Sequence, residues 1–211
     1  TLDLLRAVAA KGAPVMDALR MAVSTVSVDQ DPAVIGPEGL PDEALALVAR
    51  FPTIVAAYWR LRQGQAPLDP RPDLGHAANY LYMLTGEEPE PDLARAVEQY
   101  QMTTVDHGFN ASTFTARVVT STGADLGAAV VAGIGALSGP SHGGAPSRAL
   151  DLLDAIGTEE NARPYLIQAV TEGEKIMGFG HRVYKTDDPR SVFLRGVAER
   201  IGAEKIEFAK V

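Results

Sequence analysis

Hydrophobic residues recur every three to four positions along most of this chain, a spacing that places them on one face of a helix. No stretch shows the convincing alternation of hydrophobic and polar positions that a half-buried β-strand would have. The pattern predicts helices over residues 41–64, 74–85, 92–104, 112–121, 125–137, 145–156 and 159–177, and a last helix between residues 188 and 202. We therefore expect an all-α protein.

Local signals indicate where these helices end or are interrupted. Pro52 falls inside the first long pattern and predicts a break or kink. The last helix should have Asp188 as its N-cap, Pro189 in its first turn and Gly202 after its end. Small residues dominate 127–136, so we expect this segment to be buried against another helix.

Two segments without helical spacing indicate how the helices are connected. Residues 65–73 contain three prolines and predict a surface loop. The glycine-rich stretch 139–144 is the best candidate for a junction between domains, because glycines between helices allow hinge motion. At 211 residues the chain could be one domain or one and a half.

Composition narrows the class of protein. The 211 residues are 46% hydrophobic and 22% charged, an ordinary balance for a protein that folds around a core. Cysteine is absent, which excludes disulfides and thiolate metal sites and fits a reducing cytoplasm. The net charge of −8 argues against a nucleic-acid partner, and no long apolar run or signal-like start indicates a membrane or exported protein. We expect a cytoplasmic protein.

Three of the four histidines lie beside glycine, in segments that connect the predicted helices. His107 precedes Gly108, His142 precedes two glycines, and His181 follows Gly-Phe-Gly. Glycine lets the backbone turn sharply and approach a ligand closely. Because Arg190 follows His181 at short range, imidazoles and a guanidinium together indicate a site for a small carboxylate substrate and proton transfer. Gaps of 35 and 39 residues between the histidines lack the short ligand pairs of a zinc site, so we expect no metal.

The segments that carry these histidines resemble, in order and spacing, three motifs of the citrate synthase family. They read DHGFNAS at 106–112, GALSGPSHGGA at 135–145 and GFGHRVYKTDDPR at 178–190. Residues 14–24 and 77–86 are also similar to bacterial members. Ser141 and Pro146 depart from the leucine and asparagine that are usual at these positions in the family, which puts the local fit in question but removes no reacting group.

This resemblance implies a citrate synthase-like all-α fold, with residues 1–140 in a large helical domain and residues 141–211 at the start of a small one. It implies a homodimer that condenses acetyl-CoA with oxaloacetate to citrate and CoA, in the tricarboxylic acid cycle, with no permanently bound cofactor. 2-Methylcitrate synthases, which use propionyl-CoA, carry the same motifs, so the acyl group stays open. A catalytically inert helical module for binding or interaction is the non-enzyme alternative.

The resemblance also implies a role for each site residue. His142 donates a hydrogen bond to the thioester carbonyl as it becomes an enolate, and His181 protonates the oxaloacetate carbonyl. His107 and Arg190 hold oxaloacetate, the arginine through paired hydrogen bonds to a carboxylate. The other implied residues lie near one of the two substrates: Asn110 and Ser112 near oxaloacetate, and Gly178, Phe179, Gly180 and Lys185 near coenzyme A.

Simpler interpretations of several of these residues remain open. Asn110 and Ser112 could equally cap the helix predicted at 112, and the glycines before His181 could form a plain turn. Six basic side chains against three acidic ones over 175–200 could be a solvated helix face or a docking surface for coenzyme A phosphates. His76 lies within a helical pattern and is interpreted as structural.

The same resemblance raises an expectation about the extent of the chain. The family's general base, an aspartate in a later motif, and further C-terminal arginines have no counterpart before Val211. The first residues already have a helical pattern. We therefore expect an internal piece of a citrate synthase, inactive by itself.

Overall fold

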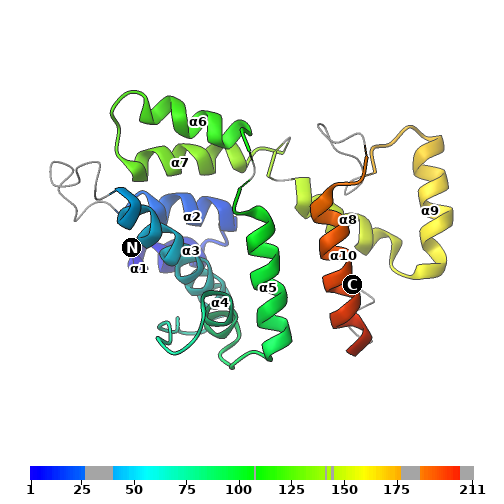
Figure 1. Cartoon of the computed structure of the whole chain (residues 1–211), viewed down its shortest axis with the longest axis horizontal. Coiled ribbons are helices and arrows are strands. Elements are labelled where there is room, and N and C mark those ends of the chain that lie inside the picture. The colour runs from blue at the N-terminus through cyan, green and yellow to red at the C-terminus, as the bar shows by residue number, and fades with distance from the viewer. Residues whose placement is uncertain (27–39, 107, 141, 144, 177–185, 205–211) are drawn as a thin grey trace. The chain divides into compact units, whose positions relative to one another are not determined.

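The computed structural model describes residues 1–26, 40–106, 108–140, 142–143, 145–176 and 186–204, and over these residues it contains helices and no strand (Figure 1). The all-α prediction is therefore confirmed. The helices are α1 (Leu2–Ala10), α2 (Val15–Val23), α3 (Leu40–Arg62), α4 (His76–Thr85), α5 (Pro91–Thr104), α6 (Ala111–Thr120), α7 (Leu126–Leu137), α8 (Ala145–Ile156), α9 (Glu159–Thr171) and α10 (Pro189–Glu204).

The chain forms two compact units, Thr1–Ala136 and Leu137–Val211. They part at the last turn of α7. The assignment of residues 1–140 and 141–211 to a large and a small domain stays a prediction.

The core of the first unit lies among α1, α2, α3 and α7. Its buried side chains include Leu5, Val23, Ile54, Tyr58 and Ile134. Tyr58 is the largest fully buried side chain among the residues that the structure describes, and its hydroxyl donates a hydrogen bond to a backbone carbonyl in the α1–α2 turn. The apolar ring of Tyr58 is thus buried while its hydroxyl is hydrogen-bonded, as a tyrosine in a core requires.

Helices α6 and α7 run side by side within this unit (Figure 1). A Cβ built on Gly133 would lie 3.6 Å from the carbonyl oxygen of Ser112 and 3.8 Å from the Cβ of Ala116, so the two helices pack against each other here. Gly127, Ala129 and Ile134 are buried. The predicted packing of 127–136 against another helix is confirmed, although Ala128 on the opposite side is exposed.

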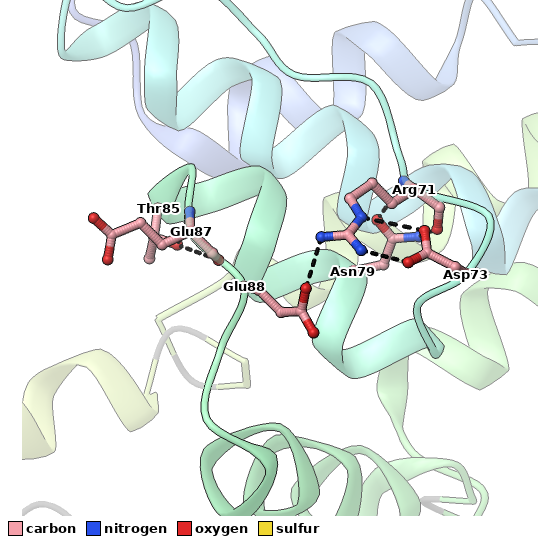
Figure 2. Close-up of polar contacts among 6 residues, drawn as sticks. All are labelled: Arg71, Asp73, Asn79, Thr85, Glu87 and Glu88. Carbon is pink, nitrogen blue, oxygen red and sulfur yellow. Dashed lines mark hydrogen bonds and ion pairs between the residues drawn. The ribbon is translucent and has the colours of Figure 1, made fainter.

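The segment 65–73 is a loop, as its prolines predict, and Arg71 ties it to α4 (Figure 2). The Arg71 guanidinium pairs with Asp73 beside it, and its Nη1 lies 2.8 Å from Oε2 of Glu88. The side-chain amide of Asn79, on α4, accepts a hydrogen bond from Arg71 N at 3.0 Å and donates one to Arg71 O at 2.6 Å. The hydrogen bond from Arg71 holds the pKa of Asp73 below its usual value.

Helix α3 continues through Pro52, so of the predicted break or kink the break is wrong and the kink stays a prediction. By length and composition alone, Pro41–Arg62 could cross a membrane, which also corrects the expectation that no apolar run is long enough. A packed core helix has the same composition. The buried side chains of Leu47, Ile54 and Tyr58 place α3 in the core of the first unit.

In the second unit, two helix ends differ from the sequence prediction. α9 ends at Thr171 rather than at residue 177, because Gly173 has a left-handed φ of +74° and the N–H of Glu174 donates to Ala169 O at 2.9 Å. This pair of features is a Schellman motif, which ends a helix by satisfying its last carbonyls. α10 begins at Pro189 as predicted but continues through Gly202 to Glu204. Gly202 is buried inside the helix and is not its C-terminal cap.

Candidate functional site

The first group of predicted site residues lies at the start of α6. Asn110 is the N-cap, and its Oδ1 accepts hydrogen bonds from Thr113 N at 2.9 Å and from Ser112 Oγ at 2.7 Å. The structure therefore brings Asn110 and Ser112 together, in the capping arrangement that the sequence left open. A capping amide keeps its N–H₂ as a donor, so capping and a role beside a carboxylate substrate are compatible. The role near oxaloacetate stays a prediction.

The turn before α6 is organised by side chains that the sequence interpretation overlooked. Asp106 Oδ1 accepts a hydrogen bond from the N–H of Gly108, whose φ is +64°. The rings of Phe109 and Phe114 meet edge to face with centroids 5.9 Å apart, and the Arg117 guanidinium lies 5.5 Å from the Phe109 centroid. Aromatic residues five positions apart with an arginine one turn later could have been recognised as such a cluster.

His142 lies in the second unit, in a tight turn between α7 and α8. Its N–H donates to the carbonyl of Gly139 at 3.0 Å, and α8 begins three residues later. The prediction that His142 comes just before a helix is confirmed. The N-terminal end of a helix carries partial positive charge, which favours an anionic group forming nearby.

Gly143 fits this turn because it has no side chain. A Cβ on Gly143 would lie 2.4 Å from Cδ1 and 2.6 Å from the backbone oxygen of Leu137. The second of these atoms belongs to the main chain and cannot rotate away. Sterics therefore explain why a glycine follows His142: the turn approaches the end of α7 too closely for a side chain at residue 143.

Arg190 lies in the first turn of α10, and its side chain folds back onto Asp188. Its Nη2 is 2.6 Å from Asp188 Oδ2, and its Nε is 3.1 Å from Oδ1. Asp188 Oδ1 also accepts the backbone N–H of Arg190 at 2.9 Å, as a residue at the N-cap does. Both side chains are mostly buried, with 27% of Arg190 and 18% of Asp188 exposed. The sequence prediction assigned Asp188 to capping and missed its pairing with the arginine.

The other predicted site residues lie outside the described part of the chain. They are His107, Gly178, Phe179, Gly180, His181 and Lys185. Their roles stay predictions, as does the assembly of residues from the two units into one site.

A hollow lies in the first unit, among residues of α3, α4, α5 and α7. It measures about 690 Å³ and is lined mainly by apolar side chains of α3 and α7, together with His76 and Tyr80 of α4 and Gln101, Thr104 and Val105 at the end of α5. Burial raises the pKa of the Tyr80 hydroxyl. None of the predicted catalytic or substrate-binding residues that the structure describes lines this hollow, so its size alone gives it no place in the chemistry. Among the described residues no cluster of three His, Cys, Asp or Glu side chains could hold a metal ion.

Nearly the whole chain is similar to proteins of one family. The chain matches the family described as "Citrate synthase, C-terminal domain" over residues 1–210. The citrate synthase of Deinococcus radiodurans is 47% identical over 192 residues, which are 90% of this chain and 51% of that protein. The 2-methylcitrate synthase of Mycobacterium tuberculosis is 43% identical over 187 residues, 89% of this chain and 47% of that protein.

A solved structure gives the same result for the fold. The citrate synthase of Thermoplasma acidophilum, in a ternary complex with carboxymethyl coenzyme A and oxaloacetate, has a TM-score of 0.84 and 26% identity, covering 99% of this chain and 55% of that chain. The chain therefore spans about half the length of the relatives it matches.

Proposed function

The chain belongs to the citrate synthase family, and on that basis we propose that the whole protein condenses acetyl-CoA with oxaloacetate to give citrate and CoA. The observation that carries the proposal is the match to this family over residues 1–210, joined by the citrate synthase of Deinococcus radiodurans at 47% identity. Acetyl-CoA and CoA act here as substrate and product, without a permanently bound cofactor.

The proposed chemistry begins at the acetyl group. A base removes a proton from the methyl carbon, and negative charge moves onto the thioester oxygen. His142 is proposed to hydrogen bond that oxygen, which is the place where charge develops and where a donor accelerates the reaction most. Its position in a turn before α8 supports this role.

The second half of the reaction takes place at oxaloacetate. The enolate carbon attacks the ketone, His181 donates a proton to the ketone oxygen, and hydrolysis of the thioester then releases citrate and CoA. His107 and Arg190 hold oxaloacetate, with Asn110 and Ser112 as neighbours. The Arg190 side chain supports this assignment because it already binds one carboxylate, that of Asp188, through two nitrogens. Gly178, Phe179, Gly180 and Lys185 are proposed to contact coenzyme A.

A second candidate, 2-methylcitrate synthase, is favoured by the Mycobacterium tuberculosis relative at 43% identity. The two activities differ in one methylene of the acyl group, a difference that a pocket discriminates by about 10–200-fold. Measuring kcat/KM of the whole protein for acetyl-CoA and propionyl-CoA separates them. A clear preference for propionyl-CoA would replace the first proposal by the second.

Substitution of the histidines tests catalysis against the non-enzyme alternative. His142→Ala and His181→Ala should each lower turnover by about 10²–10⁴-fold, because each removes a proton donor from the transition state. His76→Ala, a histidine outside the site, is the matched control and should keep wild-type turnover. If the two catalytic variants keep it as well, the assignment is wrong and a binding or interaction module becomes the better description.

We further propose a cytoplasmic homodimer. The absence of cysteine supports the compartment. The small residues of α7, of which Ala128 is exposed, and the exposed Phe114 and Val118 of α6 offer an apolar surface for a second copy. Sedimentation of the whole protein at micromolar concentration tests the dimer, and a monomer would contradict it.

A further inference from the structure

We propose that Asp188 is a positioning residue for oxaloacetate binding: it fixes the Arg190 guanidinium in the orientation that receives the substrate carboxylate. This inference rests on the proposed function, because it assigns Asp188 a task only if Arg190 binds oxaloacetate. It goes beyond that function by assigning a role to a second residue, Asp188, which acts through the arginine.

Three contacts between these two residues carry the inference. Nη2 of Arg190 lies 2.6 Å from Oδ2 of Asp188, and Nε lies 3.1 Å from Oδ1 and 3.2 Å from Oδ2. The carboxylate therefore pairs with the Nε–Nη2 edge of the guanidinium. A planar guanidinium that is held along one edge has its plane fixed, and its Nη1–Nη2 edge then has a defined direction.

Backbone hydrogen bonds in the first turn of α10 anchor this ion pair. Oδ1 of Asp188 accepts the N–H of Arg190 at 2.9 Å, and the carbonyl of Asp188 accepts the N–H of Val192 at 3.1 Å in the first turn of α10. The carboxylate is thus held by the helix that carries the arginine. This pairing restricts rotation about the single bonds of the long arginine side chain, so less conformational entropy is lost when a substrate binds.

Two other roles for Asp188 predict different results. If Asp188 only caps α10, then asparagine, which caps equally well, should leave substrate binding unchanged. If its charge matters only through long-range Coulomb effects, its removal should strengthen the binding of the anionic oxaloacetate. Positioning predicts the opposite sign, namely weaker binding.

Asp188→Asn in the whole protein tests this inference. We expect the KM for oxaloacetate to rise about tenfold or more, in the range seen when residues that orient ligand-binding side chains are removed. At saturating oxaloacetate kcat should change by less than about threefold, because uniform substrate binding is what is lost. The KM for acetyl-CoA should stay at its wild-type value.

Asp187→Asn is the matched control, because it removes the same charge from the exposed neighbouring residue. It should leave the KM for oxaloacetate unchanged. Asp188→Ser, which keeps a capping oxygen but not the ion pair, provides a second variant should the asparagine protein unfold. An Asp188→Asn or Asp188→Ser protein that folds and has an unchanged or lower KM for oxaloacetate would overturn the inference.

A double-mutant cycle separates this inference from the function on which it rests. Arg190→Gln should raise the KM for oxaloacetate, and adding Asp188→Asn to it should have no further effect, since Asp188 acts through Arg190. If Arg190→Gln leaves the KM unchanged, the proposed role of Arg190 in oxaloacetate binding fails. If only Arg190→Gln raises the KM and Asp188→Asn does not, the positioning role alone fails.

Discussion

At the scale of single residues, Gly143 fits tightly beside a proposed catalytic group. A Cβ there would lie 2.4–2.6 Å from atoms of Leu137, so Gly143→Ala must move the turn that carries His142. A displacement of about 1 Å can cost about 10²-fold in rate. We expect kcat of the whole protein to fall by about that factor, measured as CoA release.

Gly196→Ala is the control for this prediction. Gly196 is an exposed residue of α10, and nothing lies within 4 Å of a Cβ built on it. This variant should keep wild-type kcat. Equal activity of the Gly143→Ala protein would show that the position of His142 tolerates the movement, or that His142 is not the group that matters.

Asn110 offers a way to separate capping from substrate binding. Asn110→Ala removes the acceptor for Thr113 N and should lower the free energy of unfolding by about 1 kcal/mol, measured by urea denaturation. Asn110→Ser keeps a capping oxygen, so its stability should stay close to that of the wild type. If Asn110 also contacts oxaloacetate, the serine variant raises the KM for oxaloacetate without losing stability. A serine variant with wild-type KM would leave Asn110 with capping alone.

Sequence motifs indicated which residues matter here but not what lies against them. Asp188 and Arg190 are two positions apart in the motif, and capping explains Asp188 from the sequence alone. Their side chains meet only because the arginine folds back along the first turn of α10. Likewise, the contact of Gly143 with Leu137 depends on the path of the turn between two helices, which no residue pattern specifies.

At the scale of elements, the loop that Arg71 ties to α4 should be sensitive to pH. The lowered pKa of Asp73 means that its pairing with Arg71 stabilises the fold at pH values above its unfolded pKa of about 3.8. This contribution is lost as pH falls through the lower folded-state pKa. Asp73→Asn should therefore reduce the free energy of unfolding at pH 7, and its difference from wild type should shrink below about pH 4.

Urea denaturation of both proteins at pH 7 and pH 3 measures that difference. Asp69→Asn, in an exposed position of the same loop, is the control. Added salt should also reduce the effect, because the acidic partners Asp73 and Glu88 are largely exposed. A difference that stays constant or grows at pH 3 would contradict the prediction.

Helix positions could be predicted from hydrophobic spacing, whereas some helix ends could not. Gly173 and Gly202 show the reason. Both are glycines near the end of a helical pattern, but Gly173 adopts a left-handed φ and ends α9, while Gly202 is buried inside α10. Which of two glycines ends a helix depends on packing around it, and the sequence does not reveal that packing. Packing also explains why α3 continues through Pro52. Leu47 and Ile54 lie on either side of the proline, and their burial in the core stabilises the helix there.

At the scale of the whole molecule, the first unit depends on a residue from its last helix. Ile134 of α7 is 5% exposed and packs in the same core cluster as Leu5 and Tyr58. Ile134→Ala should lower the free energy of unfolding by about 2–5 kcal/mol, because it removes buried methyl groups and leaves a cavity. Urea denaturation followed by the fluorescence of Trp59, the single tryptophan, measures the change.

Leu45→Ala provides the comparison, because Leu45 is 67% exposed on α3 of the same unit. Its effect should be within about 0.5 kcal/mol of zero. Equal losses from the two substitutions would mean that α7 does not contribute to this core.

The fold class and the family could be predicted because they depend on features repeated along the chain. Helical spacing recurs from residue 41 to the last helix, and three histidine motifs occur in one order. The site could be predicted only as a set of residues. His107 and His181 lie outside the described residues, and Asn110 and His142 belong to different compact units, so the geometry that joins them remains a prediction.

The place of Ile134 in the first core also has a consequence for the order of events during synthesis. A ribosome that adds about 5–20 residues per second needs about 4–15 s to make the roughly 75 residues between Tyr58 and Ile134. During that interval α1, α2 and α3 can already pack together, but α7, which contributes Ile134 to their core, has not yet been synthesised. The nascent chain therefore exposes an incomplete apolar surface for seconds, and this is the period in which a holding chaperone would have its largest effect on the yield of folded protein.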